Sequence, residues 1–397
     1  MKDKKPISTC KPSSGCCSSD KNQETTVNNA IVRRDFLKAM GLATGGLLMG
    51  LPALSFGQSK SKQGFLNDKD LPEGWFENLY KRGEPEIYKG KDLAYVGMPI
   101  GGLFSGTVYL GGDGKLWLWD IFNEKKEGIV SKTYENWQGK KEIKSRDGAN
   151  FVFPVSPEYP FEQGFGIKVK QKKKEWQKSL DFKGFEDIAF KGQYPIAEVS
   201  YRDEDLPVEI DLKSFSPFVP LDVKSSSYPA TIMRYKVRNT SDKKVSVELS
   251  GWLENAALNN TENTDEVQLK NNIQQNAGNT LLNCKASTNS ETLMNQRDFG
   301  NMSLLLMDSK TTSQASAEVK INSSVLFPEN ETKEANATHG EQLIGGLSQS
   351  FSLEPNETKD ITFIVSWYFP NIKLPHIQKS VVENKGWYYK NHFQNAS

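Results

Sequence analysis

A glycine-rich stretch, VGMPIGGLFSGTVYLGGDGKLWLWDIFN, restricts the backbone of this chain more than any other segment, and it runs from Val96 to Asn123. Its first half contains Gly97, the adjacent Gly101 and Gly102, and Gly106. A chain needs glycine where it bends at a place that a Cβ atom would obstruct. The spacing matches neither GxGxxG nor GxxxxGK[ST], and a strand rather than a helix follows. The stretch therefore favours turns of a β domain over a phosphate-binding loop.

The second half of the stretch predicts a β-hairpin. Two β-prone runs, 107–110 and 115–120, are joined by a Gly-Gly-Asp-Gly turn at 111–114, which supplies the positive φ angles that a tight connection needs. Alternation along the second run places Trp117 and Trp119 on one face and two leucines on the other. Both faces of this strand are therefore expected to be covered.

Alternating apolar and polar residues follow in most of the readable runs after residue 151. A period of two indicates strands with one buried face and one wet face, as antiparallel sheets have. No repeat of solenoid length is visible. The predicted fold class is all-β: a large antiparallel β-sandwich of two sheets packed face to face. The clearest apolar positions are Val208, Ile210 and Leu212, then Met233, Tyr235 and Val237, then Val245, Val247 and Leu249.

A segment with two prolines, FSPFVPLD at 215–222, interrupts these strands. Proline cannot pair within a central strand, so we interpret the segment as an ordered crossover loop. Two roles remain open for it: a cap on the core, or a loop that faces a substrate cleft.

Three later segments complete the predicted fold. Residues 255–300 are rich in Asn, Thr, Glu and Gln, which indicates weak strands and long loops. The runs 347–353 and 361–367 flank a Glu-Pro-Asn-Glu-Thr segment and are predicted to form a second hairpin. Residues 383–394 have the pattern of the first turns of an amphipathic helix, the start of a linker helix at the C-terminus.

The charge balance excludes a general attraction to nucleic acid or acidic membranes, because 50 Lys and Arg face 49 Asp and Glu. The basic run 170–174 is interpreted as a solvated hairpin tip, since no aromatic residues interleave with it. Cys10, Cys16 and Cys17 lie upstream of a processing signal, so only Cys284 is expected in the mature chain. The fold should therefore rest on burial rather than on disulfides.

That processing signal resembles a twin-arginine export signal. Arg33 and Arg34 begin the motif RRDFLK, an apolar run at 39–54 follows, and small residues at 55–57 offer a cleavage site. The apolar run contains glycines and a proline and is short for a permanent membrane helix, which disfavours an anchored chain. We therefore predict a periplasmic or secreted protein without a stable membrane span after cleavage.

No motif identifies a catalytic centre. The three histidines, His339, His376 and His392, lack the spacing of a zinc site, there is no GxSxG elbow, and Cys284 has no catalytic motif around it. A glycosidase needs two carboxylates across the bond that it cleaves, and no acid here has a distinctive context. We predict no catalytic residue, no metal and no cofactor in this chain. The acids considered are Asp120, Glu124, Glu186, Asp187, Asp203 and Asp222.

Three motifs stand in order along the chain: GMPIGGLFSGTVYLGGDGKLWLWDIFN at 97–123, FKGQYPIAEVSYRDEDLPVEIDLKSFSPFVPLDVKSSSYPATIMRYKVRN at 190–239, and FIVSWYFPN at 363–371. Together they resemble the N-terminal region of glycoside hydrolase family 116, which includes bacterial β-glucosidases and the non-lysosomal glucosylceramidase. The resemblance extends from Trp75 to the C-terminus, and FSPFVPLD with its downstream SSYPA is the most specific part. The Asn-rich residues after Asn255 do not obviously match.

This resemblance implies an N-terminal β-sandwich that packs against a C-terminal (α/α)6 barrel. In the family a Glu nucleophile and an Asp acid/base both lie on the barrel, and the reaction retains anomeric configuration. The expected partners are the chain's own C-terminal (α/α)6 domain and, through the parent enzyme, a β-linked glycoside. The parent would be a β-glucosidase-like enzyme, and this chain alone is expected to be inactive. Candidates for the barrel interface or cleft rim are Gly97, Gly101, Gly102, Ser216, Pro217 and Asp222.

The expected organisation is a polar tail and signal at 1–57, a linker at 58–74, the sandwich at 75–372, and at 373–397 a linker toward a barrel absent from this chain. A short helix is expected between residues 71 and 82. Two other roles stay open: a free-standing carbohydrate-binding or adaptor sandwich without catalytic activity, and a structural scaffold at the cell surface.

Overall fold

The computed structural model describes residues 74–81, 83–123, 131–135, 141–145, 160–276, 278–309, 313–321, 325–372 and 386–397. The chain divides into two compact units, 1–82 and 83–397. In the first unit the expected short helix is present as α2 (Trp75–Asn78). Arg33, Arg34, Glu124 and His376 lie outside the described residues. Among the helices that are described, none has the length and apolar character needed to span a membrane.

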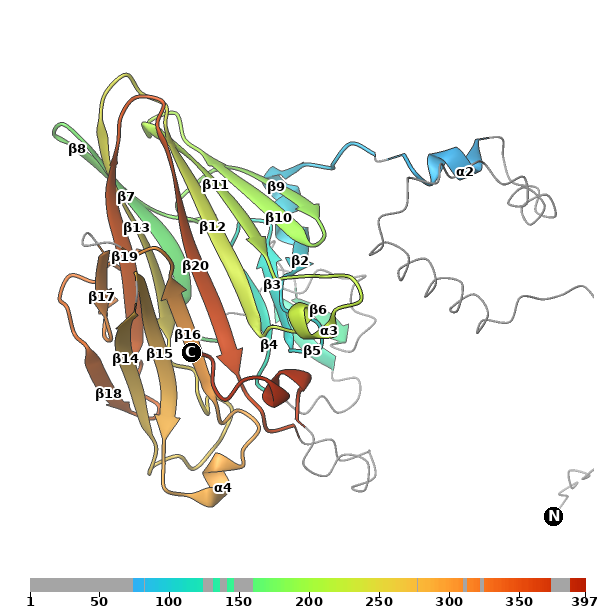
Figure 1. Ribbon diagram of the computed structural model, residues 1–397, viewed down its shortest axis with the longest axis vertical. Helices are drawn as coiled ribbons and strands as arrows, with labels where there is room; N and C mark the ends of the chain where they lie inside the picture. Colours follow the sequence, from blue (N-terminus) through green and yellow to red (C-terminus); the bar gives the residue numbers. More distant parts are fainter. Residues whose placement is uncertain are drawn as a thin grey trace, which may run out of the picture. The chain divides into compact units, whose positions relative to one another are not determined.

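The second unit has two main β layers, seen side by side in Figure 1, and every strand pair in them is antiparallel. This confirms the all-β sandwich. The ten-stranded sheet has the order β1 (Tyr88–Lys89), β9 (Asp187–Gln193), β10 (Ile196–Arg202), β11 (Val208–Phe215), β12 (Ala230–Asn239), β20 (Thr358–Tyr368), β16 (Asn301–Leu306), β15 (Asn279–Ser287), β14 (Gln268–Asn276) and β18 (Glu334–Thr338). The five-stranded sheet has the order β17 (Ser313–Ser316), β19 (Ile344–Leu353), β13 (Val245–Glu254), β7 (Gln163–Gln171) and β8 (Lys174–Ser179).

Smaller elements complete the unit. They include two short sheets. They also include one α-helical turn after β11, a second α-helical turn after β15, and two 3₁₀ helices. Their bounds are β2 (Gly97–Pro99), β3 (Thr107–Gly111) and β4 (Leu116–Asp120) in one sheet, β5 (Ser131–Glu135) and β6 (Lys141–Ser145) in the other, and α3 (Val223–Ser226), α4 (Glu291–Met294), η3 (Gly90–Tyr95) and η5 (Tyr388–Asn391).

The core lies between the two large sheets, because alternate residues of each strand point inward. Phe165 of β7 meets Tyr235 of β12 and Phe363 of β20, with ring centroids 5.2 and 5.3 Å apart. All nine apolar positions predicted on β11, β12 and β13 are buried, with exposed fractions of 2% or less. The period of two therefore identified the inward faces of these strands correctly.

The outer face of the ten-stranded sheet carries charged side chains in cross-strand pairs. Glu198 of β10 pairs with Lys191 of β9 at 3.1 Å and with Lys213 of β11 at 2.9 Å. Arg234 of β12 pairs with Asp360 of β20 at 2.6 Å. Charges of both signs that are already paired suit a face in contact with water.

The small sheet β2-β3-β4 bonds to the inner face of the ten-stranded sheet. Tyr201 Oη of β10 donates to Asp113 O at 2.9 Å, and Trp367 Nε1 of β20 donates to Ser105 O at 2.7 Å. The β3-β4 hairpin confirms the prediction from the glycine-rich stretch. The hairpin's turn therefore lies against the core rather than in solvent.

Strict alternation fails along β4. Leu116 and Trp119 are buried, whereas Trp117 and Leu118 are half-buried. Leu118 has a φ of 52°, and the pairing of β3 with β4 shifts register between Thr107 and Tyr109. A bulge of this kind changes the face to which later residues point, so the predicted grouping of the two tryptophans was wrong.

The predicted second hairpin is also wrong. Its two runs form β19 and β20, but β19 pairs with β13 and β17 in one sheet, and β20 pairs with β12 and β16 in the other. The segment 354–357 therefore carries the chain from one layer to the next. A turn sequence between two alternating runs is the same in both cases, and only the pairing partners separate a hairpin from such a corner.

Residues 255–300 hold more strand than expected, because β14 and β15 are nine residues each. Their buried polar side chains bond to one another and to the backbone. Asn255 Nδ2 donates to Lys285 O at 3.0 Å and to Asn271 Oδ1 at 3.1 Å, and Asn271 Nδ2 donates to Ala317 O at 3.0 Å. Satisfied buried amides allow polar sequence inside a sheet, so composition underestimated these strands.

The predicted C-terminal helix is not formed over residues 386–394. The segment makes one 3₁₀ turn, η5, and its course is set by contacts with the sandwich. Tyr389 is fully buried and its Oη donates to Phe369 O at 3.0 Å, while Trp387 Nε1 donates to Asn123 Oδ1 at 2.6 Å. Tertiary contacts of these aromatic side chains override the helical pattern.

The basic run at 170–174 is the β7-β8 turn, as predicted, with Lys172 at a φ of 55°. Cys284 is buried and free. Burial raises the pKa of its thiol far above the usual range, which keeps it protonated and unreactive.

Two core tyrosines provide a test of buried hydroxyl groups. Tyr201 Oη donates to Asp113 O and, at 3.2 Å, to Leu180 O, whereas Tyr235 Oη has no partner among the described residues. We expect Tyr201→Phe to lower the free energy of unfolding at pH 7 by about 1–2 kcal/mol, because two carbonyls lose a donor. Tyr235→Phe should leave it unchanged or raise it. Urea unfolding measures both, and an equal loss in the two variants would contradict the assignment.

The same pair has a pH signature. Burial raises the pKa of both hydroxyls well above the ordinary value of 10.0. Above pH 10 the unfolded chain releases protons that the native state retains, so stability that is complete below pH 10 falls as pH rises further. Tyr235→Phe should reduce this alkaline loss by up to about 1.4 kcal/mol per pH unit.

Candidate functional site

Two loops meet beside the end of the ten-stranded sheet where β11 ends and β12 begins. One joins β2 to β3 (residues 100–106), and the other joins β11 to β12 (residues 216–229). Leu103 N donates to Ser226 O at 2.7 Å. A Cβ atom on Gly102 would overlap the carbonyl oxygen of Tyr228, so the two backbones touch there. The structure thus brings together the two segments that the sequence singled out.

Of the six predicted interface residues, Gly101 and Gly102 lie in the first loop, and Gly97 lies in β2 opposite Gly111. Ser216 is buried at the start of the second loop, and its Oγ has no hydrogen-bond partner among the described residues. Pro217 is half-buried next to it. The second loop joins neighbouring antiparallel strands, so describing it as a crossover was wrong.

Asp222, the sixth of these residues, is the N-cap of α3. Its Oδ1 accepts from Ser225 N at 3.0 Å and its Oδ2 accepts from Ser225 Oγ at 2.6 Å. These hydrogen bonds hold the pKa of the carboxyl below its usual range. Asp222 therefore has a structural role as a helix cap. Its carboxyl group is ionised, so it has no proton to donate.

Internal hydrogen bonds hold both loops in place. Ser226 Oγ donates to Val219 O and accepts from Val219 N, both at 2.9 Å. Ser105 Oγ donates to Gly102 O at 2.7 Å, and the Ser105 carbonyl accepts from Trp367. The loops are therefore ordered before any partner arrives, which lowers the entropy cost of binding.

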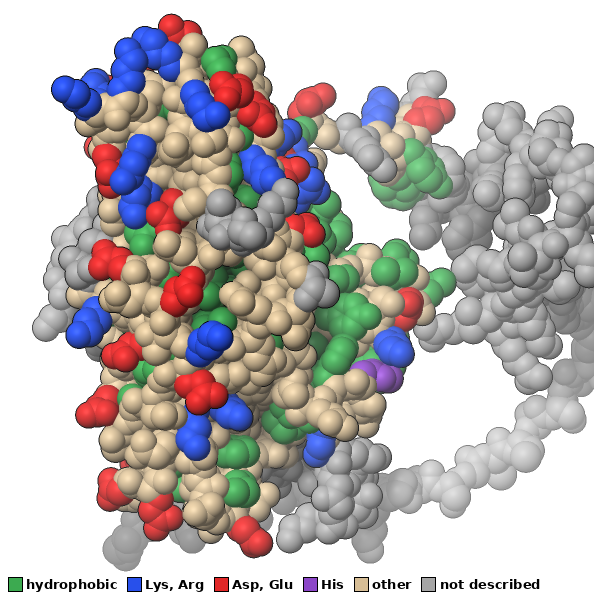
Figure 2. Space-filling model, turned by 60° about the vertical axis from the view of Figure 1, so that its left-hand side comes forward, with side chains coloured by type: hydrophobic (Ala, Val, Ile, Leu, Met, Phe, Trp, Pro, Cys, Tyr) green, Lys and Arg blue, Asp and Glu red, His purple; other side chains and the backbone are tan. Residues whose placement is uncertain are grey.

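Large apolar side chains project from these loops and from the neighbouring β9-β10 turn. Phe104 is 68% exposed and Leu221 is fully exposed. The rings of Tyr194 and Phe218 pack 5.5 Å apart and connect the turn to the second loop. Figure 2 shows hydrophobic side chains gathered on one side of the sandwich. We call the following set the loop surface: Leu103, Phe104, Tyr194, Ile196, Phe218, Val219, Leu221 and Val223.

Two of these residues also have unfavourable backbone angles. Phe104 has a φ of 56° and Leu221 a φ of 70°, in the left-handed region that large side chains rarely adopt. Hydrogen bonds within the loops hold these two strained residues in place. Backbone strain of this kind is typical of sites selected for contact with a partner rather than for stability. Sequence reasoning found the two loops but missed the importance of these side chains. The sequence signal that could have identified them is a pair of large apolar residues next to a turn-forming residue, near glycine in LFSG and next to proline in FVPL.

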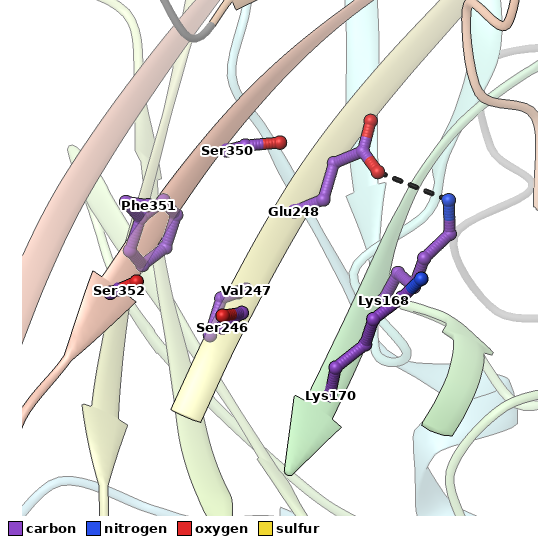
Figure 3. A pocket seen from close by; sticks show the side chains of 8 residues that line it. All are labelled: Lys168, Lys170, Ser246, Val247, Glu248, Ser350, Phe351 and Ser352. Atoms are coloured by element: carbon purple, nitrogen blue, oxygen red, sulfur yellow. Dashed lines mark hydrogen bonds and ion pairs between the residues drawn. The ribbon is translucent and has the colours of Figure 1, made fainter. Parts of the chain in front are cut away.

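A second feature is a hollow of about 390 Å³ on the outer face of the five-stranded sheet (Figure 3). Only one acid, Glu248, lines it, and that acid is paired with Lys168 at 3.0 Å. The hollow therefore lacks the two facing carboxylates of a glycosidase centre. The lining consists of Lys168, Lys170, Ser246, Val247, Glu248, Ser350, Phe351 and Ser352.

Two of the acids considered from the sequence are engaged in separate ion pairs. Asp187 pairs with Lys89 at 3.4 Å, and Asp203 pairs with Lys178 at 2.5 Å. His339 bonds to Thr264 and to Leu258 O, far along the chain from His392. In the part of the chain that the structure describes, no group of three His, Cys, Asp or Glu side chains is placed to hold a metal ion.

Comparison with known proteins gives one family. The family model described as "beta-glucosidase 2, glycosyl-hydrolase family 116 N-term" matches residues 97–397. No curated protein matches the sequence.

Several solved structures are similar at low sequence identity. A polysaccharide lyase is 12% identical over 77% of this chain and 35% of its own, with a TM-score of 0.31. A galactose mutarotase-like protein from Lactobacillus casei is 8% identical over 69% of this chain and 100% of its own, with a TM-score of 0.34. A family GH92 α-mannosidase from Bacteroides thetaiotaomicron is 10% identical over 70% and 32%, with a TM-score of 0.29. The chain thus spans about a third of the lyase and of the mannosidase.

Proposed function

The chain belongs to the family of N-terminal domains found in glycoside hydrolase family 116, and we therefore propose that it is the non-catalytic sandwich of an exported, retaining β-glycosidase. It is a glycoside-hydrolase-associated domain. Its role in the proposal is to dock, through the loop surface, against the (α/α)6 catalytic domain of the same polypeptide. The loop surface is the observation that carries this proposal.

The chemistry of the loop surface supports a protein partner. Its exposed apolar side chains come from two hydrogen-bonded loops and the neighbouring β9-β10 turn, whereas the outer face of the ten-stranded sheet carries paired charges. Exposed apolar patches on an ordered scaffold mark interaction sites, because burying them on association is favourable. Because the loops are already ordered, binding loses less free energy to ordering them, and the affinity is higher.

The position of the C-terminal segment supports the choice of partner. The ring of Phe393 lies 5.5 Å from that of Tyr228, which is in the second loop. Ala396 N donates to Asn301 Oδ1 at 3.2 Å, so the segment is bound along the same end of the sheet. A domain joined to this segment would begin beside the loop surface. The matched family model is itself described as N-terminal.

The docking proposal is tested by co-expressing the chain with a family-116 catalytic domain. Replacing Phe104 and Leu221 with aspartate should reduce co-purification and hydrolysis of an aryl β-glucoside at least about tenfold, because charge is placed where apolar surface must be buried. Both sites have left-handed backbone angles that aspartate tolerates better than Phe or Leu, so folding should be preserved.

Ile321→Asp is the matched control, since Ile321 is 55% exposed but lies outside the loop surface. It should co-purify like the unchanged chain. If the unchanged chain does not associate, or if all three variants behave alike, docking through these loops is refuted and the free-standing sandwich becomes the better hypothesis. Turnover of the aryl β-glucoside by the chain alone would refute its non-catalytic role.

Export is the second part of the proposal, and it is supported by the RRDFLK motif and the apolar run after it. Changing Arg33 and Arg34 to lysine should keep the precursor in the cytoplasm, because the pathway reads the arginine pair. Cell fractionation measures this. Unchanged periplasmic accumulation of the double-lysine variant would count against this export route.

A further inference from the structure

The hollow on the five-stranded sheet is built from two cross-strand rows. In the first row Lys168 of β7, Glu248 of β13 and Ser350 of β19 are register partners, and in the second row Lys170, Ser246 and Ser352 are. Figure 3 shows the two rows side by side across the three strands. Successive outward positions on neighbouring strands therefore form one continuous polar surface.

The hollow exists because serine is short. Ser246 and Ser352 are directly opposite each other and exposed, while longer lysine side chains rise from β7 beside them. Val247 and Phe351 lie between these outward positions, and their side chains pack against the core, so the apolar surface of the hollow comes from the carbon stems of the two lysines. The volume of about 390 Å³ falls in the range of small-molecule sites.

The charged groups in and beside the hollow are paired with one another. Glu248 Oε2 accepts from Lys168 Nζ at 3.0 Å, and Glu248 Oε1 accepts from Ser348 Oγ at 2.8 Å. The Lys168 ammonium also lies 4.0 Å from the centroid of the Phe327 ring. Lys170 is paired with Glu175 of β8 at 3.0 Å. The lining holds two cations and one anion, and Glu175 beside it pairs with the second cation, so little net charge is left to attract an ionic ligand.

We infer that this hollow is a binding site for a neutral saccharide. A sugar hydroxyl both donates and accepts hydrogen bonds, and the hollow offers serine hydroxyls, lysine donors and one carboxylate acceptor. The carbon stems of Lys168 and Lys170 offer the C–H groups of a sugar ring an apolar contact. The site lies on the five-stranded sheet, and it is independent of the proposed docking through the loop surface.

Isothermal titration of the full chain with cellotetraose and with laminaritetraose tests the inference. At least one of them should bind saturably below about 10 mM. Ser246→Trp and Ser352→Trp fill the hollow and should each weaken that binding at least about tenfold. Both positions are exposed on strands, where tryptophan is well tolerated.

Thr358→Trp is the matched control, because Thr358 is an exposed strand residue in the other sheet. It should bind like the unchanged chain, and thermal unfolding should show that all three variants are folded. Glu248→Gln keeps the size of the side chain and should weaken binding of the neutral sugar. Three results would each overturn the inference: no saturable binding of either tetrasaccharide, equal weakening by the control, or binding of a sulfated tetrasaccharide in place of the neutral ones.

Discussion

Alanine at position 102 should destabilise the sandwich by about 3 kcal/mol and separate the two loops of the loop surface. An added Cβ would overlap the Tyr228 carbonyl oxygen and lie 2.9 Å from its carbonyl carbon and 3.0 Å from that of Ser227. These are backbone atoms, and Tyr228 O already accepts from Ala230 N at the start of β12. Relief therefore requires moving a loop, which breaks the bond from Leu103 N to Ser226 O.

Two alanine variants are controls for this effect. At Gly101 the nearest atom to a new Cβ would be Gly106 O at 3.2 Å, so Gly101→Ala should cost less than Gly102→Ala. At Gly83 nothing lies within 4 Å, and Gly83→Ala should change stability by no more than about 0.5 kcal/mol. Urea midpoints measure the series. Equal shifts for positions 101 and 102 would show that the loops are not in close contact.

Local pattern predicted the strands of the core because each sheet buries one face against the other. On β12, Met233, Tyr235 and Val237 alternate with three basic residues because only one face of the strand is buried. This pattern can be read without knowing which strands lie beside β12. The β3-β4 hairpin was found for a similar reason, since its glycines mark a turn that few other residues can make. Both signals are contained within a few residues.

The failures concern contacts between distant segments. The turn at 354–357 does not record that β20 pairs with β12, more than a hundred residues earlier. The C-terminal segment has helical periodicity, but Tyr389 is held by Phe369 and Trp387 by Asn123. In β14 the polar composition concealed a strand whose Asn271 is satisfied by Asn255 and Ala317. Each outcome depends on a partner that local sequence cannot identify.

The candidate site was predicted in outline only. Glycine and proline located the two loops, and the family resemblance suggested that they face a partner. Which side chains project from them depends on the packing beneath: Ile100 and Ser105 are buried, whereas Phe104 between them is exposed. Asp222 was an interface candidate and one of the acids without a distinctive context, and only its bonds to Ser225 show that it caps a helix. The polar hollow had no sequence signal, because its two rows come from three strands that are distant in the chain.

The second large effect is expected at Trp367, which anchors the first loop to the ten-stranded sheet. It is fully buried, its Nε1 donates to Ser105 O at 2.7 Å, and its ring edge lies beside Gly101. Trp367→Ala should lower the free energy of unfolding by about 3–5 kcal/mol, through the cavity and the carbonyl left without a donor. Because the same bond positions Ser105, the exposed Phe104 next to it should lose its fixed place as well.

Phe363→Ala separates the local effect from the global one. Phe363 is fully buried in the same strand and packs on Phe165 rather than on the loop. Its replacement should lower the free energy of unfolding by a similar amount, about 3–5 kcal/mol. Hydrogen exchange of the Leu103 amide then distinguishes the two variants, because its bond to Ser226 O joins the loops. Under native conditions protection should fall further in Trp367→Ala than in Phe363→Ala, and docking should weaken with it. Equal protection at Leu103 in both variants would mean that the loop is held by its own hydrogen bonds and that Trp367 serves the core alone.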